Sequence, residues 1–114
     1  MAGCGGSSTA ACKLTAINVF PNTATASHTA VAPGNTQLFS AFVGAASGNC
    51  AVQQSNLTNA TWTVSDTTNA SISNVHDATY GNATCKGATS TTVTATVPAG
   101  DGTTVSGTAS LTCN

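Results

Sequence analysis

The chain has 114 residues, which is the usual size of one domain. It contains two lysines, three aspartates and neither arginine nor glutamate, so no basic surface can hold a phosphate backbone and nucleic acid is not an expected partner. Threonine and valine favour strands, whereas asparagine, glycine and serine favour turns. Large apolar side chains are few, so the composition predicts an all-β domain with a thin core that needs covalent support.

Residues 1–11 are rich in glycine and serine and precede the first predicted strand. We expect a flexible tether here and a single folded domain over residues 12–114. Ala2-Gly3-Cys4 followed by Gly5 resembles the end of a bacterial lipoprotein signal, although Met1 stands where leucine is common. The resemblance implies a lipid on Cys4 and a longer precursor. The alternative is a disordered N-terminus with an incidental thiol.

Short runs of alternating apolar and polar residues recur between turn signals, the pattern of a β-sandwich. Pro21 ends the first run, since proline cannot donate to a β-ladder. Turns are expected at 33–35 and 98–102, and a long polar loop over 44–59. Residues 76–86 are only weakly patterned. The expected strands are 13–20, a poorer edge strand over 25–31, 37–43, 60–65, 70–72, 91–97 and 103–113.

The predicted core centres on the single tryptophan. Trp62 and Val64 share one face of their strand, because successive side chains alternate between the two faces. Val93 lies on the apolar face of a later strand, and Phe39 on that of an earlier one. We expect Trp62 to be buried between the inner faces of both sheets, beside Phe39 and Val93.

Several segments in combination resemble the bacterial immunoglobulin-like group 2 domain. They are LTAINVFP (14–21), VAPGNTQLFSA (31–41), TWTVSD (61–66), ASI (70–72) and TTVTAT (91–96). The resemblance covers residues 14–113, with an extra stretch before Val31 and a long insert between Val43 and Ala60. It implies an immunoglobulin-like antiparallel β-sandwich of about seven strands, on a bacterial surface or secreted protein. It implies no shared catalytic residues.

Five cysteines occur, at Cys4, Cys12, Cys50, Cys85 and Cys113. Their wide spacing, without a CxxC pair or a nearby histidine, favours disulfides in an oxidising compartment over a zinc site. Leaving Cys4 aside, the other four allow three connectivities. The strand directions of an immunoglobulin-like sandwich place Cys12 near the loop that carries Cys50, and Cys85 and Cys113 at the opposite end. We therefore expect Cys12–Cys50 and Cys85–Cys113, with Cys4 unpaired.

Residues that could support catalysis or metal binding are isolated. His76 precedes Asp77, but adjacent strand residues face opposite ways and no nucleophile-elbow sequence is present. His28 and His76 lack partner ligands for a metal. Asp101 lies in a Gly-Asp-Gly turn without the further oxygen donors that calcium needs. We expect no enzyme activity, no cofactor and no metal.

The function expected from these features is a non-catalytic display, adhesion or interaction module of the bacterial cell envelope, extracytoplasmic or secreted. Its partner would be a surface protein or a glycan, and it would touch the membrane only through lipid on Cys4. A first alternative is an envelope-glycan or small-ligand binding module, although Tyr80, Phe20 and Phe42 are too few to argue a stacking surface. A second is a self-assembling surface subunit, because the uncharged edge strands lack the lysines that usually block edge pairing.

Overall fold

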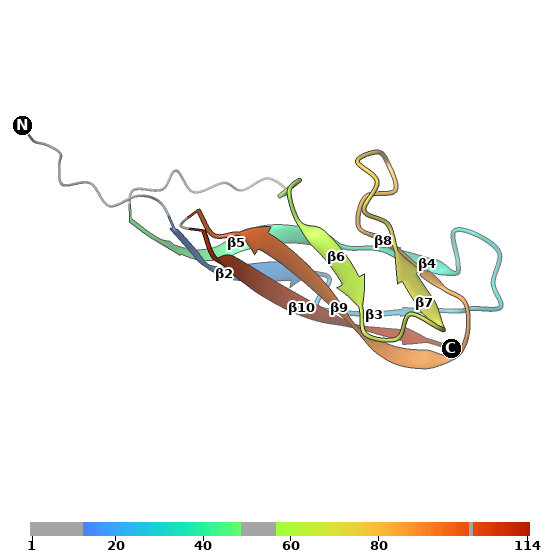
Figure 1. The fold of residues 1–114 in the computed structure, drawn as a ribbon. Coiled ribbons are helices and arrows are strands. Elements are labelled where there is room, and N and C mark those ends of the chain that lie inside the picture. Colours follow the sequence, from blue (N-terminus) through green and yellow to red (C-terminus); the bar gives the residue numbers. More distant parts are fainter. Residues whose placement is uncertain (1–12, 49–56, 101) are drawn as a thin grey trace, which may run out of the picture.

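The computed structural model describes residues 13–48, 57–100 and 102–114. These ranges form the all-β, immunoglobulin-like antiparallel sandwich that the sequence predicts (Figure 1). None of them contains a helix, and so none offers a helical segment that could span a bilayer. The strands are β2 (Lys13–Phe20), β3 (Thr23–Ala26), β4 (Thr36–Leu38), β5 (Ser40–Ser47), β6 (Thr61–Val64), β7 (Ala70–Ile72), β8 (Asn82–Cys85), β9 (Thr89–Pro98) and β10 (Thr104–Cys113).

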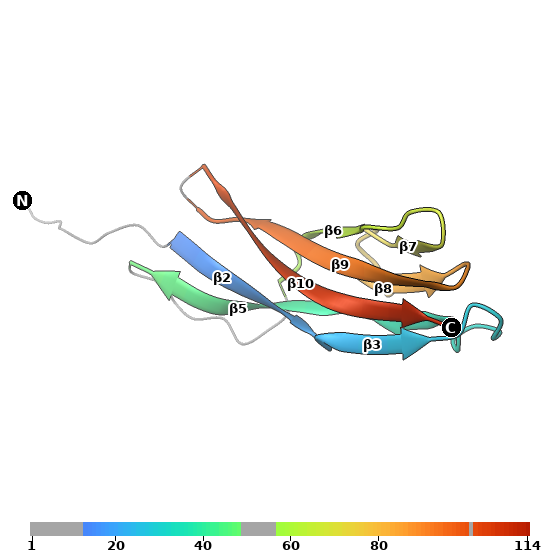
Figure 2. The same ribbon diagram turned by 90° about the horizontal axis from the view of Figure 1, so that it is seen from below.

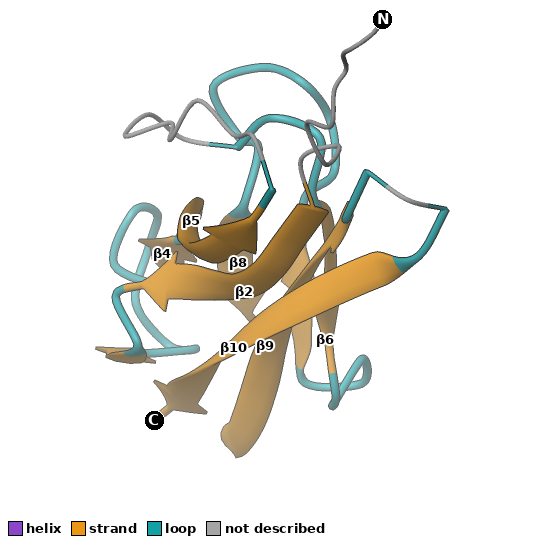
Figure 3. Ribbon diagram, turned by 90° about the vertical axis from the view of Figure 1, so that its left-hand side faces the viewer, coloured by secondary structure: helices purple, strands orange, loops and turns teal. Residues whose placement is uncertain are grey.

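The strands are arranged in two layers. One layer is a four-stranded sheet in the order β3-β10-β9-β6, and Figure 2 shows β3 and β9 on either side of β10. The other layer consists of the pair β2-β5 and the three-stranded sheet β4-β8-β7. Seen along the long axis, β2 and β5 lie across from β10, β9 and β6 (Figure 3). The second layer is therefore discontinuous at the junction of β4 and β5.

The described residues form nine strands where about seven were expected, because the expected strand 37–43 is divided in two and the segment 76–86 contains an additional strand. The chain breaks first at Pro21, as expected: β2 pairs with β5 in one layer, and β3 then pairs with β10 in the other. The β3–β10 pair is parallel, whereas the other strand pairs among the described residues are antiparallel. β3 is an edge strand as expected, but it lies over Thr23–Ala26 rather than 25–31. The second break lies at Phe39, between β4 and β5.

Two other sequence predictions need correction. β5 continues to Ser47, so the first residues of the expected 44–59 loop are strand, with exposed side chains. The weakly patterned stretch 76–86 contains β8, which pairs with both β4 and β7. Ala83 and Cys85 of β8 face the core. Because both side chains are small, the alternation of apolar and polar residues along this strand is hard to recognise in the sequence.

Trp62, Phe39 and Val93 are all buried in one core, as predicted. Trp62 retains only 2% of its accessible surface, and Val93 none. The layers approach closely where β2 crosses β10. A Cβ placed on Gly107 of β10 would lie 2.3 Å from the carbonyl oxygen of Ile17, so only glycine fits there without movement of β2.

A disulfide joins Cys85 at the end of β8 to Cys113 at the end of β10, with the two Cα atoms 5.6 Å apart. It connects the two layers, and both cysteines are buried. The predicted pairing of Cys85 with Cys113 is confirmed. Cys4, Cys12 and Cys50 lie outside the described residues, so the Cys12–Cys50 bridge and the lipid on Cys4 stay predictions.

Candidate interaction surface

A cleft of about 280 Å³ opens at the discontinuity between β4 and β5. Its base contains the buried side chains of Phe39 and Trp62. Leu38 and Leu57 line it on one side and Tyr80 on another, where the segment between β7 and β8 passes over the tryptophan. The cleft therefore lies where the two pieces of the second layer separate, and its base is the centre of the core.

The backbone geometry at the cleft depends on Gly81. The N–H of Phe39 donates to the Gly81 carbonyl at 2.9 Å, which carries the chain across the break between β4 and β5. Gly81 has a φ of 77°, in the left-handed region that favours glycine. A Cβ on this residue would lie 2.4 Å from the Phe39 oxygen and 3.3 Å from the Trp62 ring. The chain before β8 can therefore come this close to the core only with glycine.

Three rings lead from the core to the surface beside the cleft. The Trp62 and Tyr80 rings meet edge to face at 6.4 Å, and His76 stacks on Tyr80 at 4.7 Å. The Tyr80 hydroxyl donates to the carbonyl of Ala60. Burial raises the pKa of Tyr80, which keeps the hydroxyl protonated and able to donate. This row of rings was not predicted from the sequence, because it depends on how the 73–81 segment folds.

His76 and Asp77 do not act on each other. The His76 Nε2 lies 2.8 Å from the carbonyl oxygen of Thr58, to which it donates. Asp77 accepts from the backbone N–H of Thr79 at 2.7 Å and from its hydroxyl at 2.6 Å, and these bonds lower the pKa of Asp77. His76 thus holds neighbouring backbone, whereas the Asp77 carboxylate stays ionised at the rim of the cleft.

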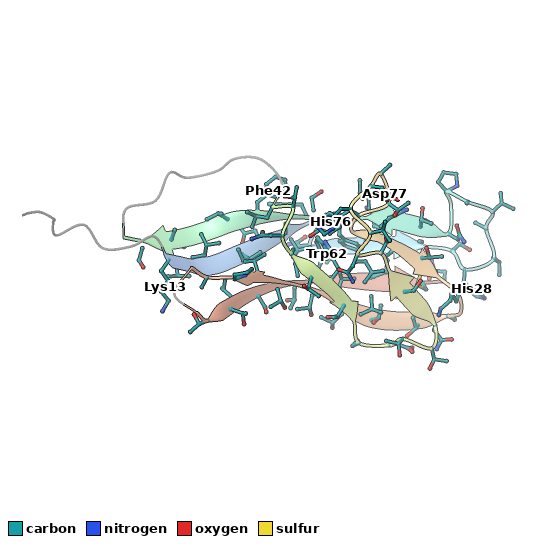
Figure 4. All side chains as sticks on the ribbon, turned by 45° about the horizontal axis from the view of Figure 1, so that its top comes forward. Lys13, His28, Phe42, Trp62, His76 and Asp77 are labelled. Carbon is teal, nitrogen blue, oxygen red and sulfur yellow. A yellow bond between two sulfur atoms is a disulfide. The ribbon has the colours of Figure 1, made fainter. Side chains whose placement is uncertain are left out.

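His28 lies toward one end of the molecule, far from His76 and Asp77 near its middle (Figure 4). Its backbone N–H donates to the carbonyl oxygen of Asn114, which its ring also contacts. Across the described ranges, no three histidine, cysteine, aspartate or glutamate side chains gather closely enough to hold a metal ion. Asp101 lies outside these ranges.

An apolar patch borders the cleft on the outer face of the second layer. Phe20 is 53% exposed and Leu38 is 52% exposed. Phe20 pairs with Ser40, so Phe42 is its diagonal neighbour across the ladder. Leu38 lies two residues before Ser40, at the end of β4. The Phe20 and Phe42 rings meet at 5.6 Å and an angle of 67°. We call Phe20, Leu38 and Phe42 the outer patch.

The outer patch adjoins the cleft at Leu38, which is exposed and also lines the cleft. Phe20, Phe42 and Tyr80 alone are too few to predict a stacking surface from the sequence. The register between β2 and β5, which the sequence pattern does not reveal, makes Phe20 and Phe42 neighbours. Among the residues that line the cleft, Asp77 is the one that carries a charge.

Comparison with known protein families finds no family that matches this chain, and no curated protein matches it. The likeness to the bacterial immunoglobulin-like group 2 domain therefore rests on the sequence motifs.

Proposed function

We propose that this chain is a non-catalytic interaction module of the bacterial cell envelope, a group 2 immunoglobulin-like domain that binds a surface protein through the outer patch. The observation that carries the proposal is the exposure of Phe20 and Leu38, beside Phe42, on an almost uncharged sheet face. Contiguous exposed apolar patches are a feature of protein contact sites. The Cys85–Cys113 disulfide supports an extracytoplasmic, oxidising location.

A protein partner suits this surface better than a glycan does. Sugar rings pack flat on an aromatic face, whereas Phe20 and Phe42 are inclined by 67° and share no common plane. A protein can place one apolar side chain against both rings and another against Leu38. The near absence of charge favours a partner chosen by shape and apolar contact rather than by electrostatic steering.

Binding of a small ligand or a glycan residue in the cleft is the second candidate. The cleft has an aromatic base and an ionised carboxylate, Asp77, on its rim. Its volume of about 280 Å³ lies near the lower end of the range for ligand sites, roughly 300–1,000 Å³. It would accept one small ring or amine, with Tyr80 beside it and Asp77 fixing its orientation.

Binding to isolated bacterial envelopes tests both candidates. The wild type is compared with a Phe20→Ser/Phe42→Ser variant and with Val31→Ser, which removes an apolar side chain that is 87% exposed but lies outside the outer patch. We expect binding by the wild type and by Val31→Ser, loss in the double variant, and loss after protease treatment of the envelopes. Loss after periodate oxidation instead would favour the glycan. Undiminished binding by the double variant would refute the role of the outer patch.

The envelope location has its own test. Expression from the full reading frame in a bacterium, followed by mass spectrometry of the mature chain, should show a diacylglycerol adduct on Cys4. A mature chain that retains an unmodified Cys4 would remove the lipid anchor from the proposal, leaving a secreted domain.

A further inference from the structure

Within the part of the chain that the structure describes, β6 forms one edge of the four-stranded sheet, with β9 on its inner side. In an antiparallel strand, alternate residues direct their N–H and C=O groups toward opposite neighbours. On β6, the backbone groups of Trp62 and Val64 are those that alternation directs away from β9, and those of Ala60, just before the strand, follow the same alternation. Unpaired groups of this kind are a template on which another strand can add.

Side chains from the segment 74–80 bond to both backbone groups of Trp62 and to the carbonyls of Ala60 and Thr58. The Trp62 N–H donates to the Asn74 Oδ1 at 2.7 Å, and the Asn74 Nδ2 donates back to the Trp62 carbonyl at 3.0 Å. The Tyr80 hydroxyl donates to Ala60, and the His76 ring donates to Thr58. The Asn74 amide thus reproduces both hydrogen bonds of a β-bridge. We call Asn74, His76 and Tyr80 the edge guard.

The edge guard is itself held in place. His76 stacks on Tyr80, and Tyr80 packs against Trp62. At the base of the segment, the N–H of Gly81 donates to the Ser73 carbonyl at 3.0 Å. The three side chains therefore reach β6 as one structured unit rather than as independent rotamers.

The strand behind the edge guard is well suited to pair with another strand. β6 reads Thr61-Trp62-Thr63-Val64, with high strand propensity, no charge and no proline. Edge strands are commonly protected by lysine or proline, and β6 has neither. A strand added here would take over hydrogen bonds that the edge guard now makes.

We propose that the outer edge of β6 is a strand-pairing surface for a second copy of this chain, held closed by the edge guard. A two-fold axis would pair one β6 with its copy in antiparallel fashion, which places the solvent-facing threonines of the two copies across from each other. Cross-strand threonine pairs are favourable. The net charge of −1 adds little repulsion between copies. This inference does not depend on the proposed function.

The decisive variants alter Asn74. Asn74→Ala removes the side chain that caps Trp62 and leaves its N–H and C=O free. Asn74→Asp is the matched control: it also loses the donor to the Trp62 carbonyl, but it places a negative charge at the edge, which disfavours strand addition. Val75→Ala changes an exposed neighbour in the same segment that contributes no side chain to the edge guard. Tyr80→Phe frees only the Ala60 carbonyl and keeps the ring packing.

Two measurements read the result: light scattering during size-exclusion chromatography over a wide concentration range, and hydrogen exchange at the Trp62 amide. We expect the wild type, Val75→Ala and Asn74→Asp to be monomeric. Asn74→Ala should double in mass as concentration rises. Its Trp62 amide should exchange fast as a monomer and slowly as a dimer. If Asn74→Ala does not fold, Asn74→Ser, which is too short to span the bridge, and Tyr80→Phe carry the test.

Three outcomes would overturn the proposal. The first is a folded guard variant that stays monomeric at every concentration. The second is association that leaves exchange at Trp62 fast, which would place the contact elsewhere. The third is equal association of Asn74→Asp and Asn74→Ala, which would point to general destabilisation rather than to an opened edge.

Discussion

Two neighbouring regions of this sandwich are held together by different interactions. The inner face of β9 and β10 is closed by apolar burial and by the Cys85–Cys113 bridge. The outer edge of β6, one strand away, is closed by hydrogen bonds from side chains to backbone. A chain with few large apolar residues can complete one side of its core with small residues and a covalent link, but it must finish the exposed edge with polar groups.

The β9–β10 region depends on length and regular alternation. The two strands pair over ten residues each, and Val93, Ala95 and Val97 of β9 are wholly buried. Alanine and glycine in these positions let the layers approach, as at Gly107. By contrast, β6 is four residues long, and one of them, Trp62, provides the largest buried side chain. Trp62 therefore belongs to both regions, with its ring in the core and its backbone at the edge.

The largest expected effect comes from the ring of Trp62. Trp62→Ala would leave a large cavity at the base of the cleft and should lower the free energy of unfolding by about 3–5 kcal/mol, a large share of the roughly 5–15 kcal/mol that keeps an ordinary domain folded. Thr63→Ala, on the exposed face of the same strand, is the control and should change stability by less than about 0.5 kcal/mol. Urea denaturation followed by circular dichroism measures both. Equal stabilities for the two variants would show that the ring does not hold the regions together.

The second effect concerns the bridge between the layers. The cysteines of the Cys85–Cys113 disulfide are separated by 28 residues, so the Cys85→Ala/Cys113→Ala variant should lose about 3–4 kcal/mol of stability in the chain-entropy model. Chemical denaturation without reductant measures it. Adding reductant to this variant then tests the predicted Cys12–Cys50 bridge. A further drop in stability would support that bridge, whereas an unchanged midpoint would contradict it.

The comparison also separates what the sequence can predict from what it cannot. The strand over Lys13–Phe20 was predicted with its observed bounds, because its alternation is clear and Pro21 ends it. The burial of Trp62 followed from the same alternation. β8 was missed, since its inward residues Ala83 and Cys85 are too small to mark a periodicity.

The outer patch and the edge guard could not be predicted from the sequence, for a different reason. The outer patch depends on the register that makes Phe20 and Phe42 neighbours, and register is set by the whole pairing of β2 with β5. The edge guard depends on Asn74 reaching back twelve residues to Trp62. Asparagine in a polar segment predicts a turn, and nothing in its local pattern distinguishes a turn residue from a side chain that replaces a β-strand.

The third effect tests how closely the cleft is built around Gly81. Gly81→Ala meets both an unfavourable φ of 77° and a clash with Phe39, and should cost about 1–3 kcal/mol, as expected of strained backbone. Gly102 has a similar φ of 89° but open space around its Cβ position. Thermal unfolding gives the loss of stability in each variant. The loss in Gly81→Ala beyond that in Gly102→Ala is therefore the cost of the clash between the new Cβ and the Phe39 oxygen. Equal midpoints would mean that the cleft backbone shifts without cost.

The smallest expected effect concerns acid and the turn between β6 and β7. Asp66 accepts from the Thr89 hydroxyl at 2.6 Å, from the Asn69 side chain at 3.0 Å and from the backbone N–H of Thr68 at 3.1 Å. These bonds, that from Thr89 foremost, lower its pKa from 3.8 to about 2. The folded state therefore holds its proton less tightly than the unfolded state. The stabilisation is complete above pH 3.8 and is lost as the pH falls toward 2.

Asp77, whose pKa is lowered by Thr79, contributes a change of the same sign, so the informative comparison is with Asp66→Asn. The thermal midpoint of the wild type should fall more steeply than that of Asp66→Asn over this acid range, and the two should run parallel near neutral pH. Parallel curves throughout would show that the bonds to Asp66 are no stronger than its bonds to water.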